Sequence, residues 1–276
     1  MQRRNAMIVP GAPNALTARV IEDIGFEAVY VTGAGVTNMF LGAPDIGLIT
    51  LSELADHVAA MRDAVAIPLI VDADTGFGNA INVGRTVRML ERSGANAIQL
   101  EDQDFPKRCG HFAGKSVISS HEMVQKLRAA VDARHDANTL IVARTDAIAL
   151  YGLDEALDRA RAYVEAGADV TFVEAPRTVA DMARIPQEVG VPQLANLVVG
   201  GLTPMLGTDE LAKMGFAIAL YANTALQAAL LAMQEVLSHL HTTGSLDDVQ
   251  KRLATFAERQ RVVAKPLFDA LEKKYA

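Results

Sequence analysis

Two aspartates, Asp72 and Asp74, follow directly after the apolar run 68–71 and precede the glycine-rich segment 75–79. In an extended strand, residues i and i+2 point to the same face, so both carboxylates can converge where a buried strand ends. Carboxylates this close repel each other unless a cation or a proton lies between them. Hard oxygen ligands at this spacing suit Mg²⁺ or Mn²⁺. The alternative is a helix N-cap beside an unrelated surface acid.

The segment around the chain's single cysteine is the second part of the sequence whose residue types suit catalysis. Cys109 lies between the cations Lys107 and Arg108 and the residue His111, and Gly110 follows it. Positive charge nearby lowers the pKa of a thiol and makes proton transfer at neutral pH feasible. The segment therefore predicts an acid/base thiol, and a free surface thiol beside solvated charges is the alternative.

The elements that would position these groups recur along the chain. Short apolar runs alternate with helix-like segments, and their starts lie on average roughly 30 residues apart, the length of one strand–helix–strand unit. The runs are apolar throughout, as expected for parallel strands that are covered on both faces. Strands are expected at residues 7–9, 28–31, 69–71, 97–100, 140–143, 170–173, 193–195 and 217–220.

Eight parallel strands with helical crossovers favour an α/β fold of the (β/α)8 TIM-barrel type over an open sheet, because closure leaves no sheet edges. The sequence predicts a barrel domain over residues 1–241 and a helical extension over residues 242–276. Residues 225–233 have little polar face. This apolar helix is expected to pack against another surface, such as a second subunit.

Polar residues follow nearly every predicted strand, and active sites of such barrels collect at this end. Two acids follow the third strand, two acids (Glu101 and Asp102) follow the fourth, and an arginine with an aspartate (Arg144 and Asp146) follows the fifth. An acidic metal site with an arginine anchor is therefore predicted. The residues concerned are Thr32, Gly33, Ala34, Asp72, Asp74, Glu101, Arg144, Glu174 and Asn196.

The composition of the chain limits the kinds of molecule that it is expected to bind. The net charge is −7 and the pI is about 5.4, which argues against nucleic acid and anionic membranes. One cysteine cannot form an internal disulfide, and neither a signal peptide nor a membrane span is evident. A cytoplasmic protein with a small-molecule substrate is expected.

Five segments together resemble the isocitrate lyase/phosphoenolpyruvate mutase superfamily, over about residues 10–240. They are residues 71–79, 99–103, 107–111, 143–147 and 172–176. The resemblance implies a barrel, dependence on Mg²⁺ (or Mn²⁺) and an α-oxocarboxylate at the site. It also implies a homotetramer, a dimer of dimers in which helices near the carboxyl terminus are swapped between subunits.

Carried over residue by residue, the resemblance implies three sets of site residues. The metal-side residues are Asp72, Asp74 and Glu101. The substrate-binding residues are Thr32, Gly33, Ala34, Asp45, Gly110 and Asn196. The catalytic residues are Cys109, Arg144, Lys107, His111 and Glu174.

The loop Lys107–Arg108–Cys109–Gly110–His111 resembles that of the carbon–carbon lyase branch, which implies cleavage of a 2-hydroxydicarboxylate or tricarboxylate to pyruvate or a related 2-oxoacid plus a carboxylate. Methylisocitrate-cleaving members carry an arginine where this chain has Gln227, which favours a dicarboxylate such as an alkylmalate or 2,3-dimethylmalate. Two other functions remain open: an oxaloacetate decarboxylase, and a non-catalytic regulator that binds an oxoacid.

Overall fold

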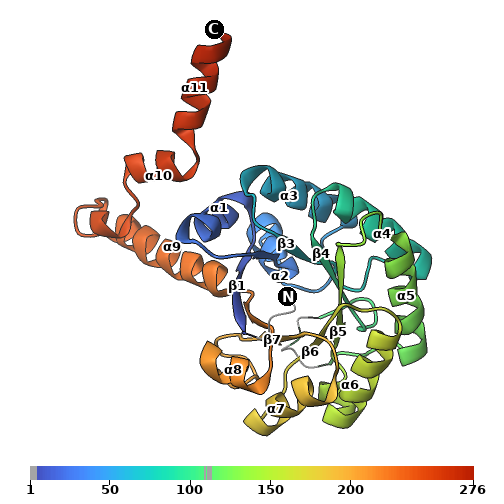
Figure 1. Ribbon diagram of the computed structural model, residues 1–276. Helices are drawn as coiled ribbons and strands as arrows, with labels where there is room; N and C mark the ends of the chain where they lie inside the picture. Colours follow the sequence, from blue (N-terminus) through green and yellow to red (C-terminus); the bar gives the residue numbers. More distant parts are fainter. Residues whose placement is uncertain (1–4, 109, 111–113) are drawn as a thin grey trace.

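A computed structural model describes residues 5–108, 110 and 114–276. In that part of the chain, strands β1 to β8 pair in parallel and in sequence order, and β8 returns to β1, so that the sheet closes into a barrel (Figure 1). The predicted TIM-type barrel is thus confirmed. The strands are β1 (Met7–Ala12), β2 (Val29–Val31), β3 (Leu69–Asp72), β4 (Ala97–Glu101), β5 (Leu140–Thr145), β6 (Val170–Val173), β7 (Gln193–Asn196) and β8 (Ile218–Tyr221).

Most strands end later than the apolar pattern predicts. Asp72, Glu101, Arg144 and Asn196 were expected just beyond their strands, but each belongs to its strand. The reason is that the parallel backbone ladder continues past the last apolar side chain, as in the pairing of Glu101 with Arg144. These four polar residues are therefore held by sheet hydrogen bonds rather than by loops.

Helices surround the barrel and connect its strands (Figure 1). The α-helices are α1 (Ala15–Ile24), α2 (Gly33–Val36), α3 (Leu51–Ala64), α4 (Ala80–Arg92), α5 (Ser120–Ala133), α6 (Ile148–Glu165), α7 (Val179–Glu188), α8 (Thr208–Met214), α9 (Thr224–Thr243), α10 (Phe256–Val262) and α11 (Lys265–Tyr275). A π-helical turn spans Thr37–Leu41 and a 3₁₀ turn spans Gln250–Arg252.

Local signals in the sequence set several helix ends. Thr50 and Glu53 form a reciprocal capping box at the start of α3, in which each side chain accepts the other residue's backbone N–H. Ser119 caps α5 by accepting the N–H of Glu122. Gly25 ends α1 with φ of 101°, a left-handed conformation that favours glycine.

The apolar strands are buried on both faces. Their outer faces pack against the helices, with Val31, Val71 and Ile98 among the buried residues. Their inner faces fill the barrel with a separate apolar cluster that includes Val9 and Ile70. This inner cluster forms the floor beneath the carboxyl ends of the strands.

The carboxyl-terminal helices extend away from the barrel (Figure 1). In α9 only Val236 is buried, and Leu231 and Leu237 are more than half exposed. Arg261 of α10 forms a two-pronged ion pair with Asp23 of α1. The apolar face of α9 has no cover within the described chain.

The domain boundary at residues 241/242 lies within α9 and stays a prediction. None of the described helices is long and apolar enough to cross a membrane.

Candidate active site

The site arises from residues that alternate along the strands. In β6, Val170 and Phe172 point into the barrel interior, and Glu174, two residues further on, lines the cavity above them. The same spacing places Asp72 above Ile70 in β3. The inward face thus changes from apolar to polar at one mouth of the barrel, as predicted for the carboxyl ends of the strands.

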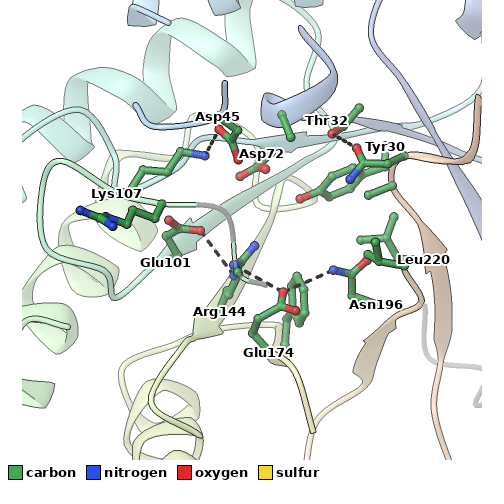
Figure 2. A pocket seen from close by; sticks show the side chains of 17 residues that line it. Tyr30, Thr32, Asp45, Asp72, Glu101, Lys107, Arg144, Glu174, Asn196 and Leu220 are labelled. Carbon is green, nitrogen blue, oxygen red and sulfur yellow. Dashed lines mark hydrogen bonds and ion pairs between the residues drawn. The ribbon is translucent and has the colours of Figure 1, made fainter. Parts of the chain in front are cut away.

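A small cavity of about 30 Å³ occupies this mouth (Figure 2). Its walls bring together most of the residues that the sequence predicts for the site, although these come from segments far apart in the chain. The predicted residues that line it are Thr32, Ala34, Asp45, Asp72, Glu101, Lys107, Gly110, Arg144, Glu174 and Asn196.

Asp72 and Asp74 converge as the spacing predicts. A Cβ atom placed on Gly33 would lie 3.2 Å from both Asp72 Oδ2 and Asp74 Oδ1, so these two oxygens face the same small space. The absence of a side chain at Gly33 keeps that space open. Burial raises the pKa of Asp74 to about 6; Lys107 opposes this shift, while Asp72 and Asp45 add to it.

Lys107 neutralises part of this acidic group. Its buried ammonium group lies 2.7 Å from Asp74 Oδ1 and also forms an ion pair with Asp45 (Figure 2). Burial alone would lower the pKa of Lys107, but the surrounding carboxylates, Asp74 foremost, raise it well above its usual value. Lys107 is therefore a fixed cation among the acids at this side of the cavity.

Arg144 is the centre of the opposite wall. Its guanidinium group donates to Asp146 at 2.8 and 3.0 Å, and it lies 3.4 Å from carboxylate oxygens of Glu101 and Glu174. The ring of Phe172 lies beneath it, 5.1 Å from the guanidinium carbon. This set of partners fixes one face of Arg144 and leaves it as a rigid donor at the cavity.

Lys115 and Asp102 hold Asp146, the partner of Arg144. The sequence places Asp102 at the end of the fourth strand, whereas it gives no role to Lys115. Lys115 donates to Asp146 Oδ1 at 2.8 Å and to the carbonyl oxygen of Gly110. Asp102 accepts the backbone N–H of Asp146 at 2.9 Å. Burial alone would raise the pKa of Asp146, but Arg144 and Lys115 lower it to about 2. Asp146 is therefore a stable carboxylate that orients two cations.

The residues present fit a magnesium ion that keeps water ligands. Among the residues that the structure describes, no three acids, histidines or cysteines are arranged to hold a metal directly. Asp72 and Asp74 nevertheless aim two oxygens at one space, and Glu101 Oε1 is buried without a hydrogen-bond partner in the described chain. Mg²⁺ is typically bound through one or two carboxylates and several waters. The acids fit that pattern better than a closed three-ligand site.

Two predicted catalytic residues, Cys109 and His111, lie outside the described residues. Their neighbour Gly110 is described and lies at the cavity. Gln227 is exposed on α9 and is not among the cavity residues.

Several residues that line the cavity were not predicted as site residues. The alternation of strand side chains could have found some of these residues, since Tyr30 and Phe172 each precede a predicted site residue by two positions. No sequence signal distinguishes Lys115 from an ordinary loop lysine. The cavity residues to which the sequence assigns no site role are Tyr30, Phe172, Val198 and Leu220.

Comparison with known proteins agrees with this geometry. The family described as phosphoenolpyruvate phosphomutase matches residues 1–241. The chain is 42% identical to a 2,3-dimethylmalate lyase of Eubacterium barkeri, over 100% of this chain and 96% of that protein. It is 46% identical to a 2-methylisocitrate lyase of Aeropyrum pernix, over 94% of this chain and 83% of that protein.

Solved structures give the same result. A crystal structure of 2,3-dimethylmalate lyase superposes with a TM-score of 0.93 at 34% identity, covering 99% of this chain and 92% of that one. A phosphonopyruvate hydrolase in complex with oxalate and Mg²⁺ superposes with a TM-score of 0.88 at 30% identity, covering 99% and 95% of the two chains. Divalent metal is thus present in a structural neighbour.

The chain therefore belongs to the phosphoenolpyruvate mutase/isocitrate lyase superfamily. Within it, the relatives assign the chain to the enzymes that cleave carbon–carbon bonds, the oxo-acid lyases.

Proposed function

We propose that this enzyme is a Mg²⁺-dependent lyase that cleaves a 2-alkylmalate, such as 2,3-dimethylmalate, into pyruvate or a related 2-oxoacid and a carboxylate. The observation that carries the substrate class is the apolar share of the cavity lining. Phe172, Val198, Leu220 and Ala222 line the cavity together with its acids and cations. An apolar lining suits alkyl substituents better than a third carboxylate, whose desolvation it would not offset.

Binding of the substrate involves polar groups at the cavity. The N–H groups of Gly33 and Ala34 begin α2 and, as first residues of a helix, lack intrahelical partners. They can receive the carboxylate next to the reacting hydroxyl. Glu174 and Asn196, which are joined by a hydrogen bond of 3.3 Å, face the other end of the substrate. Asn196 Oδ1 is buried without a partner in the described chain and can accept from the substrate.

The reaction is a retro-aldol cleavage. The hydroxyl on C2 gives its proton to water, the C2–C3 bond breaks, and the C2 oxygen becomes the carbonyl of the 2-oxoacid. The electron pair of the broken bond goes to C3, next to the second carboxylate, and one proton must be delivered there. Cys109 is proposed as the donor of that proton, with Lys107, Arg108 and His111 keeping its thiol pKa in range. Arg144 supplies a preorganised donor to the C2 oxygen.

Mg²⁺, when bound, would act as a Lewis acid for the oxygen that becomes negative. Asp72 and Asp74 would hold it, with Glu101 near it directly or through water. Asp45 would act on this group indirectly, because it is ion-paired with Lys107. Mn²⁺ has the same preference for oxygen ligands and is an alternative ion for these residues.

Incubation of the protein and Mg²⁺ with a panel of alkylmalates, 2-methylisocitrate and oxaloacetate tests the proposal. Formation of a 2-oxoacid from an alkylmalate, suppressed by excess chelator, is the expected result. Loss of oxaloacetate alone would identify a decarboxylase, and that reaction would not need Cys109. Binding of an oxoacid without turnover of any compound would identify a regulator.

We propose further that the enzyme is a homotetramer, a dimer of dimers in which α9 and the helices after it pack on a partner subunit. The exposed apolar face of α9, including Leu231 and Leu237, supports this arrangement. Light scattering gives the mass in solution, and a Leu237→Glu variant should shift it toward smaller species. The acidic charge and single cysteine support a cytoplasmic location.

A further inference from the structure

A buried amide–phenol pair lies directly beneath the acidic group. Gln99 of β4 and Tyr30 of β2 are 0% and 2% exposed. The Tyr30 hydroxyl donates to Gln99 Oε1 at 2.9 Å, and Gln99 Nε2 donates to Asp72 Oδ1 at 3.0 Å. The surrounding interior is otherwise built from residues such as Ile70 and Val142. A polar pair in such a layer is expected only where its hydrogen bonds are satisfied.

Tyr30, Gln99 and Asp72 thus form a chain of hydrogen bonds, here called the relay. The chemistry of the three groups fixes which atom donates and which accepts in each hydrogen bond. A carboxylate can only accept hydrogen bonds, so the amide must turn its Nε2 toward Asp72. The amide oxygen then faces Tyr30, whose hydroxyl is the donor it needs. Tyr30 therefore locks the amide of Gln99 in the orientation that serves Asp72.

The relay decides which oxygen of Asp72 is presented to the cavity. Asp72 Oδ1 receives two N–H groups, from Gln99 Nε2 at 3.0 Å and from the backbone of Asp74 at 3.2 Å. The other oxygen, Oδ2, faces the space beside Gly33 that Asp74 Oδ1 also faces. Rotation of the carboxylate would break both hydrogen bonds of Oδ1, so Oδ2 stays aimed at that space.

We propose that Tyr30 and Gln99 are positioning residues for the metal, which hold Asp72 so that Oδ2 faces the cation. This inference rests on the proposed function, because it assumes that Asp72 is a metal-side carboxylate. Hydrogen-bonded partners of metal-binding carboxylates typically contribute 10- to 100-fold to metal affinity. The relay extends the metal site one layer down into the barrel.

A matched control exists elsewhere in the barrel. Gln193 of β7 is also fully buried; its Oε1 accepts from Thr171 at 2.7 Å and its Nε2 donates to the carbonyl of Val191 at 2.8 Å. It is not among the cavity residues. Gln99→Met and Gln193→Met thus remove the same amide from equally buried positions, and only the first touches Asp72.

The test is calorimetric titration of the metal-free protein with Mg²⁺, in the absence of substrate, alongside urea unfolding. Gln99→Met should weaken Mg²⁺ binding about 10- to 100-fold, whereas Gln193→Met should lower stability and leave Mg²⁺ affinity unchanged. Tyr30→Phe removes only one oxygen atom and should weaken binding less.

Two outcomes separate this inference from the proposed function. If the unaltered chain binds Mg²⁺ and Gln99→Met binds it as tightly, the positioning role is wrong while the metal site stands. If the unaltered chain does not bind Mg²⁺, the proposed function itself is wrong. If Gln99→Met fails to fold, the test uses Tyr30→Phe instead. Undiminished Mg²⁺ affinity in Tyr30→Phe would then overturn the inference.

Discussion

Gly110 lies directly against Arg144. A Cβ atom at Gly110 would overlap Arg144 Nη2 and would come within 2.7 Å of the carboxyl carbon of Glu174. The carbonyl oxygen of Gly110 is in turn bound by Lys115, which also holds Asp146 behind Arg144. Gly110, which follows the predicted acid/base thiol in the sequence, is thereby held against the residue that is predicted to stabilise the oxyanion.

Gly110→Ala should therefore push the backbone at residue 110 away from Arg144. Because a shift of about 1 Å in a catalytic group can lower the rate about 100-fold, we expect a decrease of that order in kcat/KM. Gly190→Ala is the control, since a Cβ there would meet nothing within 4 Å. Steady-state kinetics with the best alkylmalate measures both. Equal activity in the two variants would mean that the contact with Arg144 is dispensable.

Cys109→Ser should abolish most turnover while sparing ligand binding. A serine hydroxyl is a much weaker acid than a thiol, so delivery of the proton to C3 would slow by about 100- to 10,000-fold. Binding of pyruvate and of Mg²⁺, followed by calorimetry, should change far less. Unchanged turnover would remove Cys109 from the mechanism and would favour the decarboxylase.

Mg²⁺ affinity should depend on pH through Asp74. Its pKa of about 6 in the folded, metal-free protein lies above the ordinary value of 3.8, so the proton competes with the cation. Affinity should be constant above about pH 7 and should fall about tenfold per pH unit below about pH 6. Because the pKa of Asp74 is raised in the folded state, its contribution to the free energy of unfolding is largest at low pH. That contribution is lost as the pH rises from about 4 to about 6. Titration calorimetry across this range measures the slope, and Asp74→Asn should remove it.

The sequence predicts the barrel and its acidic mouth well because both depend on simple periodicity. Apolar runs such as 69–71 mark buried strands, and Asp72 and Asp74 follow at the spacing that places both on one face. Their convergence beside Gly33 is what that pattern predicts.

The rest of the site depends on contacts between distant segments. Lys107 reaches Asp45, 62 positions away, and Gln99 reaches Tyr30, 69 positions away. Neither pairing follows from local spacing, because it requires the lengths of the intervening loops and the stagger of the strands. The assignment of Lys107 as a catalytic residue likewise did not anticipate that it would form ion pairs with two of the acids.

Asp146 should stabilise the fold in a way that acid reverses. Its pKa of about 2 in the folded state lies below the ordinary value of 3.8, so at neutral pH the ionised form contributes about 2 kcal/mol to the free energy of unfolding. A lowered pKa gives stability that is complete above the unfolded-state value and is lost as the pH falls from about 4 to about 2. Asp146→Asn should be less stable than the unaltered chain at neutral pH, because Lys115 and Arg144 each lose their carboxylate partner. Urea unfolding of both proteins at several pH values should show this difference narrowing in acid, as Asp146 is protonated in the unaltered chain. A difference that stays constant down to about pH 3 would mean that the charge of Asp146 is not what stabilises the site.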